Sequence, residues 1–273
     1  MKLLSYSFVL VVLVAFSFAH RAEHRIRSSL LRKRALDGYF VVDQAEGDEL
    51  GCSDAQIATL HEAVVEAKYL ARRASDVLAS ADATDSTAYL KWFGKENANA
   101  IMRTEIKENN YDPVANVKSP YERNRIHDAN LAALSPTGLT FVCIPSDFSL
   151  CAPGAQAIAF QTGSISDNTG PLVTLCPPFF KSVKWQAMVD DWRTSGKPKL
   201  TPGFALLHEL QHIPQITGDA RRCTDVSNYA PAPNDVGKMC YHPYCCEHID
   251  GKDKVQNAQN MAFFALDVIV NRF

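Results

Sequence analysis

The stretch TPGFALLHELQHIP, residues 201–214, is the most informative part of this chain. Thr201 can cap the start of a helix, and Pro202 suits a first helical position, where no amide hydrogen is needed. Pro214 ends such a helix, because proline cannot continue one. The pattern therefore predicts a helix over residues 202–213. Its core-facing side carries the apolar residues Phe204, Leu206, Leu207, Leu210 and Ile213.

Two histidines of this helix, His208 and His212, are four residues apart and therefore lie on one face. Imidazoles so placed can bind one Zn²⁺, and the Glu209 carboxylate beside them can take a proton from a zinc-bound water. Zinc lowers the pKa of that water towards about 7. The alternative is a pair of ordinary helix histidines with a surface glutamate. The helical pattern and its apolar support favour the zinc site, with Glu209 as general base.

A catalytic zinc ion needs a third protein ligand and an open position for water. In one known arrangement that ligand is a histidine six residues after the second one, but this position is Gly218. The ligand is therefore expected among the acidic residues that follow the helix, which are Asp219, Asp225, Asp235, Glu247 and Asp250.

The first residues have the form of a secretory signal peptide. Met1-Lys2 is a short basic start, the run to Phe18 is almost wholly apolar, and Ser17 and Ala19 are the small residues that favour cleavage after Ala19. No later stretch approaches the roughly 20 apolar residues of a membrane span. We therefore expect residues 1–19 to be removed and the protein to be secreted to the extracellular space.

The next segment, residues 20–34, is basic and ends in Arg32-Lys33-Arg34, which predicts a propeptide cleaved at its dibasic end. The alternative is an uncleaved basic tail. Cleavage leaves residues 35–273 as one domain with 21 basic and 29 acidic residues, a net charge of −8. We expect no nucleic-acid binding, because phosphate contacts need clustered Lys and Arg.

Eight cysteines in an exported chain imply disulfides. None forms a C-x-x-C pair, so a structural zinc ribbon is not expected, and the spacing alone leaves the pairing open. The cysteines are Cys52, Cys143, Cys151, Cys176, Cys223, Cys240, Cys245 and Cys246.

The remaining pattern is mainly helical. Ser53 precedes a long amphipathic helix expected over 53–81. A second helix is expected over 86–106, anchored by Tyr89, Trp92, Phe93, Ile101 and Ile106. Further helices are expected over 121–134 and, as a last amphipathic helix, over 253–270, with 214–252 irregular.

Short β-prone runs separate these helices, at 138–144, 156–161 and 172–176. The expected fold class is therefore α+β, mainly α-helical, with a small β region and disulfide staples.

Several segments resemble the deuterolysin-like aspzincin metalloendopeptidases, which are secreted mostly by fungi. In that family H-E-x-x-H is followed by G-T-x-D-x-x-Y-G, whose Asp is the third zinc ligand, and by an N-A-D-N element. The segments that carry the resemblance, besides the two histidines and Glu209, are Cys52–Gln56, Leu175–Phe180, Thr224-Asp225, Cys240–Cys245 and Asn257–Asn260.

The resemblance implies a zincin-like metalloprotease domain with Zn²⁺ bound by His208, His212 and Asp225. It also implies that a tyrosine, Tyr241, assists as proton donor or oxyanion partner. The Gly-Thr pair of the family pattern is degraded here, so Asp219 and Asp235 remain alternatives to Asp225. Tyr229 remains the alternative to Tyr241.

The family's early cysteines imply two disulfide pairs, Cys52 with Cys143 and Cys151 with Cys176. The last four cysteines are then expected to pair among themselves. Lysine-specific members have acidic residues around N-A-D-N, where this chain has Gln259 and Ala262. We therefore expect broad or apolar-leaning cleavage.

Together these inferences predict a secreted zinc metalloendopeptidase, a hydrolase that acts on protein or peptide substrates as a monomer. The alternative is a non-proteolytic secreted zinc-binding antigen or effector on a related fold. Fungal surface antigens that resemble this fold have Arg in place of the motif's Glu. The retention of Glu209 favours the enzyme.

Overall fold

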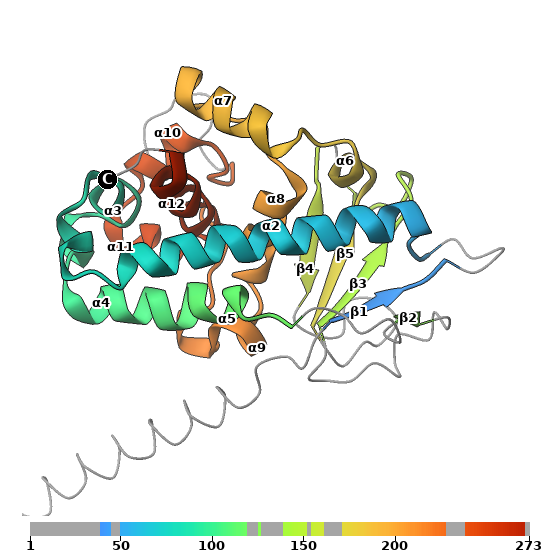
Figure 1. The fold of residues 1–273 in the computed structure, drawn as a ribbon, viewed down its shortest axis with the longest axis horizontal. Helices are drawn as coiled ribbons and strands as arrows, with labels where there is room; N and C mark the ends of the chain where they lie inside the picture. The colour runs from blue at the N-terminus through green and yellow to red at the C-terminus, as the bar shows by residue number, and fades with distance from the viewer. Residues whose placement is uncertain are drawn as a thin grey trace, which may run out of the picture. The chain divides into compact units, whose positions relative to one another are not determined.

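A 25-residue helix, α2 (Asp54–Leu78), packs against α8, α12 and α5 of the folded unit (Figure 1). It begins at a capping box, in which the Ser53 hydroxyl accepts from Gln56 N and the Gln56 side chain accepts from Ser53 N. Ten of its side chains are buried along one face. The helix predicted over 53–81 with Ser53 as its cap is confirmed.

The computed structural model describes residues 39–44, 50–118, 125–126, 139–151, 154–160, 171–227 and 238–270. They belong to one unit, Leu36–Phe273. The predicted signal peptide, residues 1–19, and the predicted propeptide, residues 20–34, lie outside the described residues.

The single helix predicted over 86–106 is wrong. Gly94, with φ of 85°, ends the first helix after Phe93, and short turns of different pitch follow. The side chain of Ile101 is 74% exposed, so it does not anchor the core. The observed elements are η1 (Ala81–Asp85), α3 (Thr87–Phe93), η2 (Lys95–Asn97), α4 (Ala100–Glu105), the π-helix η3 (Ile106–Tyr111) and α5 (Asp112–Ala115).

One five-stranded sheet lies beside these helices, in the order β2-β1-β3-β5-β4. All neighbouring strands run parallel except β4, which is antiparallel to β5 and forms one edge of the sheet among the described strands. The strands are β1 (Tyr39–Val42), β2 (Arg125–Ile126), β3 (Leu139–Cys143), β4 (Ala157–Phe160) and β5 (Leu172–Leu175).

The three β-prone runs are confirmed as β3, β4 and β5, whereas β1 and β2 were not expected. The helix predicted over 121–134 is wrong at Arg125–Ile126, which pair with Val41 and Val42 of β1. The rest of that segment lies outside the described residues.

The second half of the chain returns to helices. The segment 214–252, expected to be irregular, contains several short ones. The elements are α6 (Pro177–Phe180), α7 (Trp185–Ser195), α8 (Pro202–Leu210), α9 (Pro214–Thr217), η5 (Asp219–Arg221), α10 (Pro243–His248), α11 (Gly251–Lys254) and α12 (Ala258–Val270).

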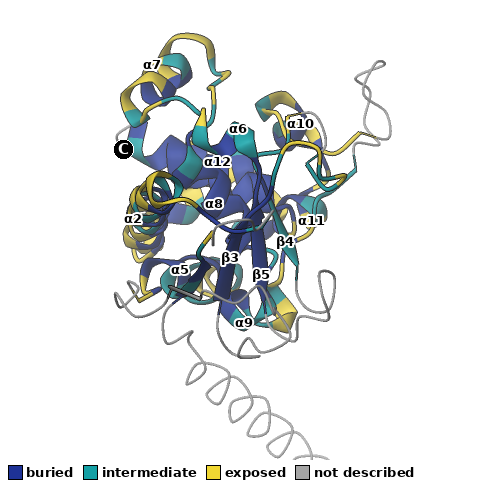
Figure 2. Cartoon of the chain, turned by 90° about the vertical axis from the view of Figure 1, so that its right-hand side faces the viewer, coloured by how far each residue is buried: buried dark blue, intermediate teal, exposed yellow. Residues whose placement is uncertain are grey.

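The last of these, α12, lies in the core. It begins at Ala258 rather than near residue 253, and all but one of its residues are buried, so it is not the amphipathic helix expected. Figure 2 shows α12, β3 and β5 in the buried colour, whereas α2 and α7 carry exposed residues. Asp267 of α12 accepts hydrogen bonds from the indoles of Trp92 (2.8 Å) and Trp192 (3.1 Å). These bonds tie α12 to α3 and α7.

Three disulfides join the described residues. Cys52–Cys143 links the start of α2 to the end of β3, and Cys151–Cys176 lies at the same end of the sheet, just after β5, so both pairs expected from the resemblance are confirmed. The first closes a sequence separation of 91 residues, which stabilises the fold by about 4–5 kcal/mol on the chain-entropy model. The third pair is Cys240–Cys245.

The expectation that the last four cysteines pair among themselves is wrong for Cys223 and Cys246, which are buried and free. The two thiols are held by different neighbours. Cys223 Sγ lies 3.5 Å from Asn110 Nδ2, whereas Cys246 Sγ donates to the carbonyl of Cys240 (3.2 Å).

The α+β class, mainly helical with a small sheet and disulfide staples, is confirmed. Among the described helices, none has the length and apolar character needed to cross a membrane.

Candidate metal centre

The helix α8 carries His208 and Glu209, and its start is fixed by α2. Thr201 caps it, with its hydroxyl oxygen 3.2 Å from Phe204 N, and the Thr201 hydroxyl also hydrogen-bonds the Glu66 carboxylate of α2. A Cβ at position 203 would collide with the Glu66 side chain, so Gly203 is what allows this close approach. The cap and first position expected from the sequence are confirmed, and the apolar side of α8 is buried as expected. The end predicted at residue 213 is wrong, because α8 ends at Leu210, His212 lies on the turn that follows, and Pro214 begins α9.

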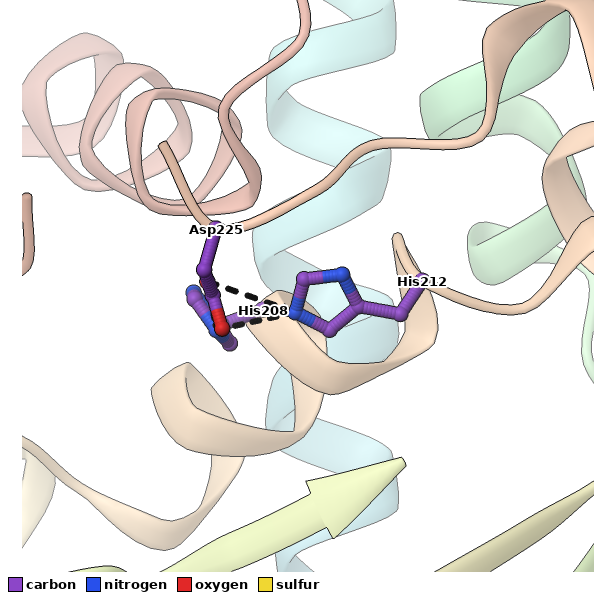
Figure 3. Close-up of side chains that lie close together, drawn as sticks. All are labelled: His208, His212 and Asp225. Atoms are coloured by element: carbon purple, nitrogen blue, oxygen red, sulfur yellow. Dashed lines mark hydrogen bonds and ion pairs between the residues drawn. The ribbon is translucent and has the colours of Figure 1, made fainter. Parts of the chain in front are cut away.

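Three side chains meet at the end of α8 (Figure 3). The Nε2 atoms of His208 and His212 lie 3.2 Å apart, and Asp225 Oδ1 lies 3.2 Å from the first and 3.5 Å from the second. Apart from these imidazoles, the buried Oδ1 atom has no hydrogen-bond partner. In the part of the chain that the structure describes, this is the one group of three or more His, Cys, Asp or Glu residues that can hold a metal ion.

The triangle formed by these three atoms has the dimensions of a metal site. Tetrahedral ligands at about 2.0–2.2 Å from zinc lie roughly 3.3–3.6 Å from one another. The observed separations of 3.2, 3.2 and 3.5 Å agree with those edges. The donor set of two imidazoles and one carboxylate also suits zinc, which binds nitrogen and oxygen ligands of these types.

Asp225 lies on a short segment, residues 222–226, which we call the ligand strap. One side of the strap is bonded to the end of α8. Cys223 N donates to Gln211 O (2.9 Å), and His212 Nδ1 lies 3.0 Å from Cys223 O. Because a carbonyl oxygen only accepts, Nδ1 of His212 carries the hydrogen. Its Nε2 then keeps the lone pair that faces the other ligand atoms.

The other side of the ligand strap is bonded to the start of α12. Thr224 N donates to Gln256 O (2.8 Å), and Thr224 O accepts from Ala258 N (3.1 Å). Val226 N donates to the Asn257 side chain (3.4 Å). The carboxylate-bearing residue is therefore fixed by backbone bonds before and after it.

Glu209 is held by the edge strand of the sheet. Its Oε2 atom accepts from Ala159 N of β4 (2.8 Å), and its Oε1 atom lies 3.8 Å from His208 Nε2. Burial raises the pKa of Glu209, and the two imidazoles and the Ala159 amide oppose that shift only in part. A carboxylate with a raised pKa accepts a proton more readily at neutral pH. Nothing in the sequence marks the contact with Ala159, because a backbone amide is supplied by any residue except proline.

Tyr241 contacts the carboxylate of Asp225. Its hydroxyl donates to Asp225 Oδ2 (2.8 Å), and its ring lies edge-on to His208, with 5.8 Å between the ring centroids. Burial and the Asp225 charge raise the pKa of Tyr241, so the hydroxyl keeps its proton. Burial would raise the pKa of Asp225 as well, but the hydrogen bonds and charges of His208 and His212 outweigh it and lower that pKa.

The other candidates from the sequence are not brought to this group. Asp219 is exposed in η5, Glu247 pairs with Lys91 (2.9 Å), and Asp250 precedes α11. Asp235 and Tyr229 lie outside the described residues.

A cavity of about 760 Å³ opens beside the three ligand atoms. Its walls come from β4 and the residues before it, from α8, from the ligand strap and from Tyr241 and Gln259. Gln259 is 3% exposed, and its Nε2 atom has no hydrogen-bond partner. The apolar part of the lining consists of Leu150, Ala155, Ala157, Ile158, Ala159, Leu200 and Ala205.

Comparisons with known proteins add little. No protein-family model matches this chain, and no curated protein does. A solved structure described as a zinc peptidase from Grifola frondosa matches it with 18% sequence identity and a TM-score of 0.47, over 79% of this chain and 97% of that one. At this TM-score the likeness supports no conclusion about function. Any functional assignment therefore rests on the side chains of the site.

Proposed function

We propose that this protein is a secreted zinc-dependent metalloendopeptidase of the aspzincin type. The observation that carries the proposal is the triangle of His208 Nε2, His212 Nε2 and Asp225 Oδ1, with the buried Glu209 carboxylate beside it and a cavity in front. These are the parts that hydrolysis with a metal-activated water requires: a three-ligand site with an open position, and a base next to it.

His208, His212 and Asp225 would hold the ion. When bound there, zinc supplies Lewis-acid chemistry, polarising a substrate carbonyl and lowering the pKa of water to about 7. Glu209 is the general base. Its Oε2 is occupied by the Ala159 amide, so Oε1, the oxygen nearer the imidazoles, takes the proton from the attacking water. The same oxygen then gives the proton to the nitrogen of the leaving amine.

Tyr241 serves the site through Asp225. The bond from its hydroxyl to Oδ2 holds the carboxylate with Oδ1 turned towards the imidazoles. The oxyanion role implied by the family resemblance requires this hydroxyl to leave Asp225 Oδ2 and to donate its hydrogen bond to the substrate oxygen instead. Tyr241 is 48% exposed and lines the cavity, which gives it access to a bound peptide.

Export fits the same proposal. Disulfides form in oxidising compartments, and three are present among the described residues. The basic and apolar start of the chain supplies the signal for secretion. We further propose that protein or peptide substrates bind in the cavity and that the protein acts as a monomer.

Hydrolysis that depends on zinc is the first expected result. The purified protein should cleave casein, a chelator should abolish the cleavage, and added Zn²⁺ should restore it, because the ligand atoms remain in place. The rival function, a zinc-binding antigen or effector without protease activity, predicts zinc binding with no cleavage. Zinc content measured on the same samples separates the two functions.

The second expected result is that cleavage is not confined to peptide bonds beside lysine. Among the described residues that line the cavity, the carboxylates are Glu209 and Asp225, and both are engaged at the metal centre. No carboxylate is left there to pair with a substrate ammonium group, and burying an unpaired charge is costly. Ala262 is fully buried and contributes no polar group. Peptide-library profiling should therefore show broad cleavage that favours apolar side chains.

The matched variant for this test is Gln259→Glu. It adds a carboxylate at the cavity wall without changing the length of the side chain, so it should increase cleavage beside Lys. Products of the unmodified protein that are cut almost only beside Lys would show that another group supplies the charge.

A further inference from the structure

The π-helix η3 carries no metal ligand, yet one of its residues contacts both segments that do. Asn110 is fully buried. Its Nδ2 donates to Gln211 Oε1 (2.9 Å), and its backbone carbonyl accepts from Gln211 Nε2 (3.1 Å). Gln211 is also fully buried and lies next to His212 in the chain. This reciprocal amide pair fixes the turn from which His212 reaches the metal centre.

The same amide group also binds Arg221, the residue just before the ligand strap. Asn110 Oδ1 accepts from Arg221 Nε (3.2 Å), and Asn110 Nδ2 donates to Arg221 O (3.0 Å). Arg221 directly precedes the ligand strap, and its guanidinium donates to Val255 O (2.9 Å) near α12. The side chain of Asn110 thus hydrogen-bonds two separate segments, one at Gln211 and the other at Arg221.

We propose that Asn110 is a positioning residue for the metal site, which sets the separation between His212 and Asp225 by bracing Gln211 and Arg221 together. This inference rests on the proposed zinc site. Groups behind metal ligands orient them and tune their affinity for the ion. Asn110 does not line the cavity, and the atoms that it binds belong to the backbone and to non-ligand side chains. The position of Asn110 in the π-helix η3 supports this role, since short π-helical segments occur frequently at functional sites.

The alternative is a buried amide that only stabilises the fold, and the chain contains a second buried asparagine that serves as the comparison. Asn97 Nδ2 donates to two backbone carbonyls, those of Phe93 (2.7 Å) and Gly251 (2.8 Å). Neither belongs to the ligand strap or to the end of α8. Asn97→Ala and Asn110→Ala therefore remove the same chemical group and leave buried polar atoms without partners in both cases.

The experiment compares zinc affinities of the full chain, measured by competition with a chelator of known affinity. Asn110→Ala should weaken zinc binding by about 10–100-fold, the usual range for a residue behind the ligands. Asn97→Ala should lower the melting temperature but leave the zinc affinity unchanged. Replacement of zinc by Co²⁺ adds a spectroscopic readout, because the visible absorption of bound Co²⁺ reports ligand geometry. Its spectrum should change in Asn110→Ala and not in Asn97→Ala.

A second, more conservative variant tests the same role in case Asn110→Ala does not fold. Asn110→Asp keeps the volume and the acceptor for Arg221 but loses the Nδ2 donor, so it should weaken zinc binding in the same direction. Gln211→Ala should do the same, and the double variant with Asn110→Ala should be little weaker than the single ones, because both remove one shared contact.

Zinc affinity equal to that of the unmodified protein in both Asn110 variants would overturn the positioning role. An equal loss in Asn97→Ala would overturn it too, since the effect would then follow from stability alone. If the unmodified protein binds zinc but hydrolyses nothing, the proposed function fails while the zinc affinities still decide the role of Asn110. If it binds no zinc, both inferences fail.

Discussion

Glu209→Gln should retain zinc and lose nearly all hydrolysis. The amide oxygen of a glutamine can still accept from Ala159 N, and the three ligand atoms do not change, so the site should keep its geometry. The variant lacks a group that takes the proton of the attacking water. General base catalysis contributes about 10²–10⁴-fold to a rate, so kcat/KM should fall by at least that factor.

The measurement pairs peptide hydrolysis with zinc content on the same preparation of Glu209→Gln. A zinc-loaded variant with full activity would contradict the role of Glu209. Loss of zinc together with activity would show instead that the carboxylate contributes to holding the ion.

Asp225→Ala should bind zinc much more weakly and show no activity. The substitution removes one corner of the triangle and leaves two imidazoles whose Nε2 atoms are 3.2 Å apart. It also removes the acceptor of the Tyr241 hydroxyl. Losing a ligand should reduce zinc affinity by more than the roughly 10–100-fold expected for a residue behind the ligands.

Asp219→Ala is the matched control, because Asp219 is an acidic residue close in sequence that is exposed and lies outside the ligand group. It should bind zinc and cleave peptides like the unmodified protein. If Asp219→Ala is the inactive variant, the third ligand has been assigned to the wrong residue, while the zinc proposal itself remains. Zinc affinity and casein cleavage measured on both variants decide between the two.

The elements that the sequence predicts well are those specified by local chemistry. α2 has an N-cap, a capping box and apolar residues at helical spacing, and α8 has Thr201, Pro202 and a continuous apolar side. The four-residue spacing of the histidines predicts that they share a face, and this holds although α8 ends at Leu210 and His212 lies on the turn that follows it. For these segments, nearest-neighbour effects and the main packing forces favour the same structure.

The errors arise where distant segments decide the outcome. β1 and β2 are short and gain their stability from pairing across more than 80 residues, for instance Val41 with Arg125. The helix expected over 86–106 is divided at Gly94, whose backbone conformation allows the turn that follows, η2, to pack on α11. α12 was expected to have a solvent-facing side, but its partners come from α2, α3, α7 and α8.

The candidate site divides in the same way. The histidine pair and Glu209 follow from the sequence, whereas Asp225 follows from a family resemblance. It is held at the pair by bonds of the ligand strap to Gln211, Gln256, Asn257 and Ala258. Asn110 has no pattern that marks it. Its role depends on where a π-turn places one amide relative to a segment about a hundred residues later.

The position of α12 determines when the metal centre can form during synthesis of the chain. Asp225 is fixed by bonds from the ligand strap to Gln256, Asn257 and Ala258, and α12 then fills the centre of the helical core. A nascent chain that already contains both histidines and Asp225 still lacks the segment that holds the carboxylate in place. The three ligand atoms can therefore assemble only after residues up to about the end of α12 have left the ribosome, so the metal centre and the helical core form together.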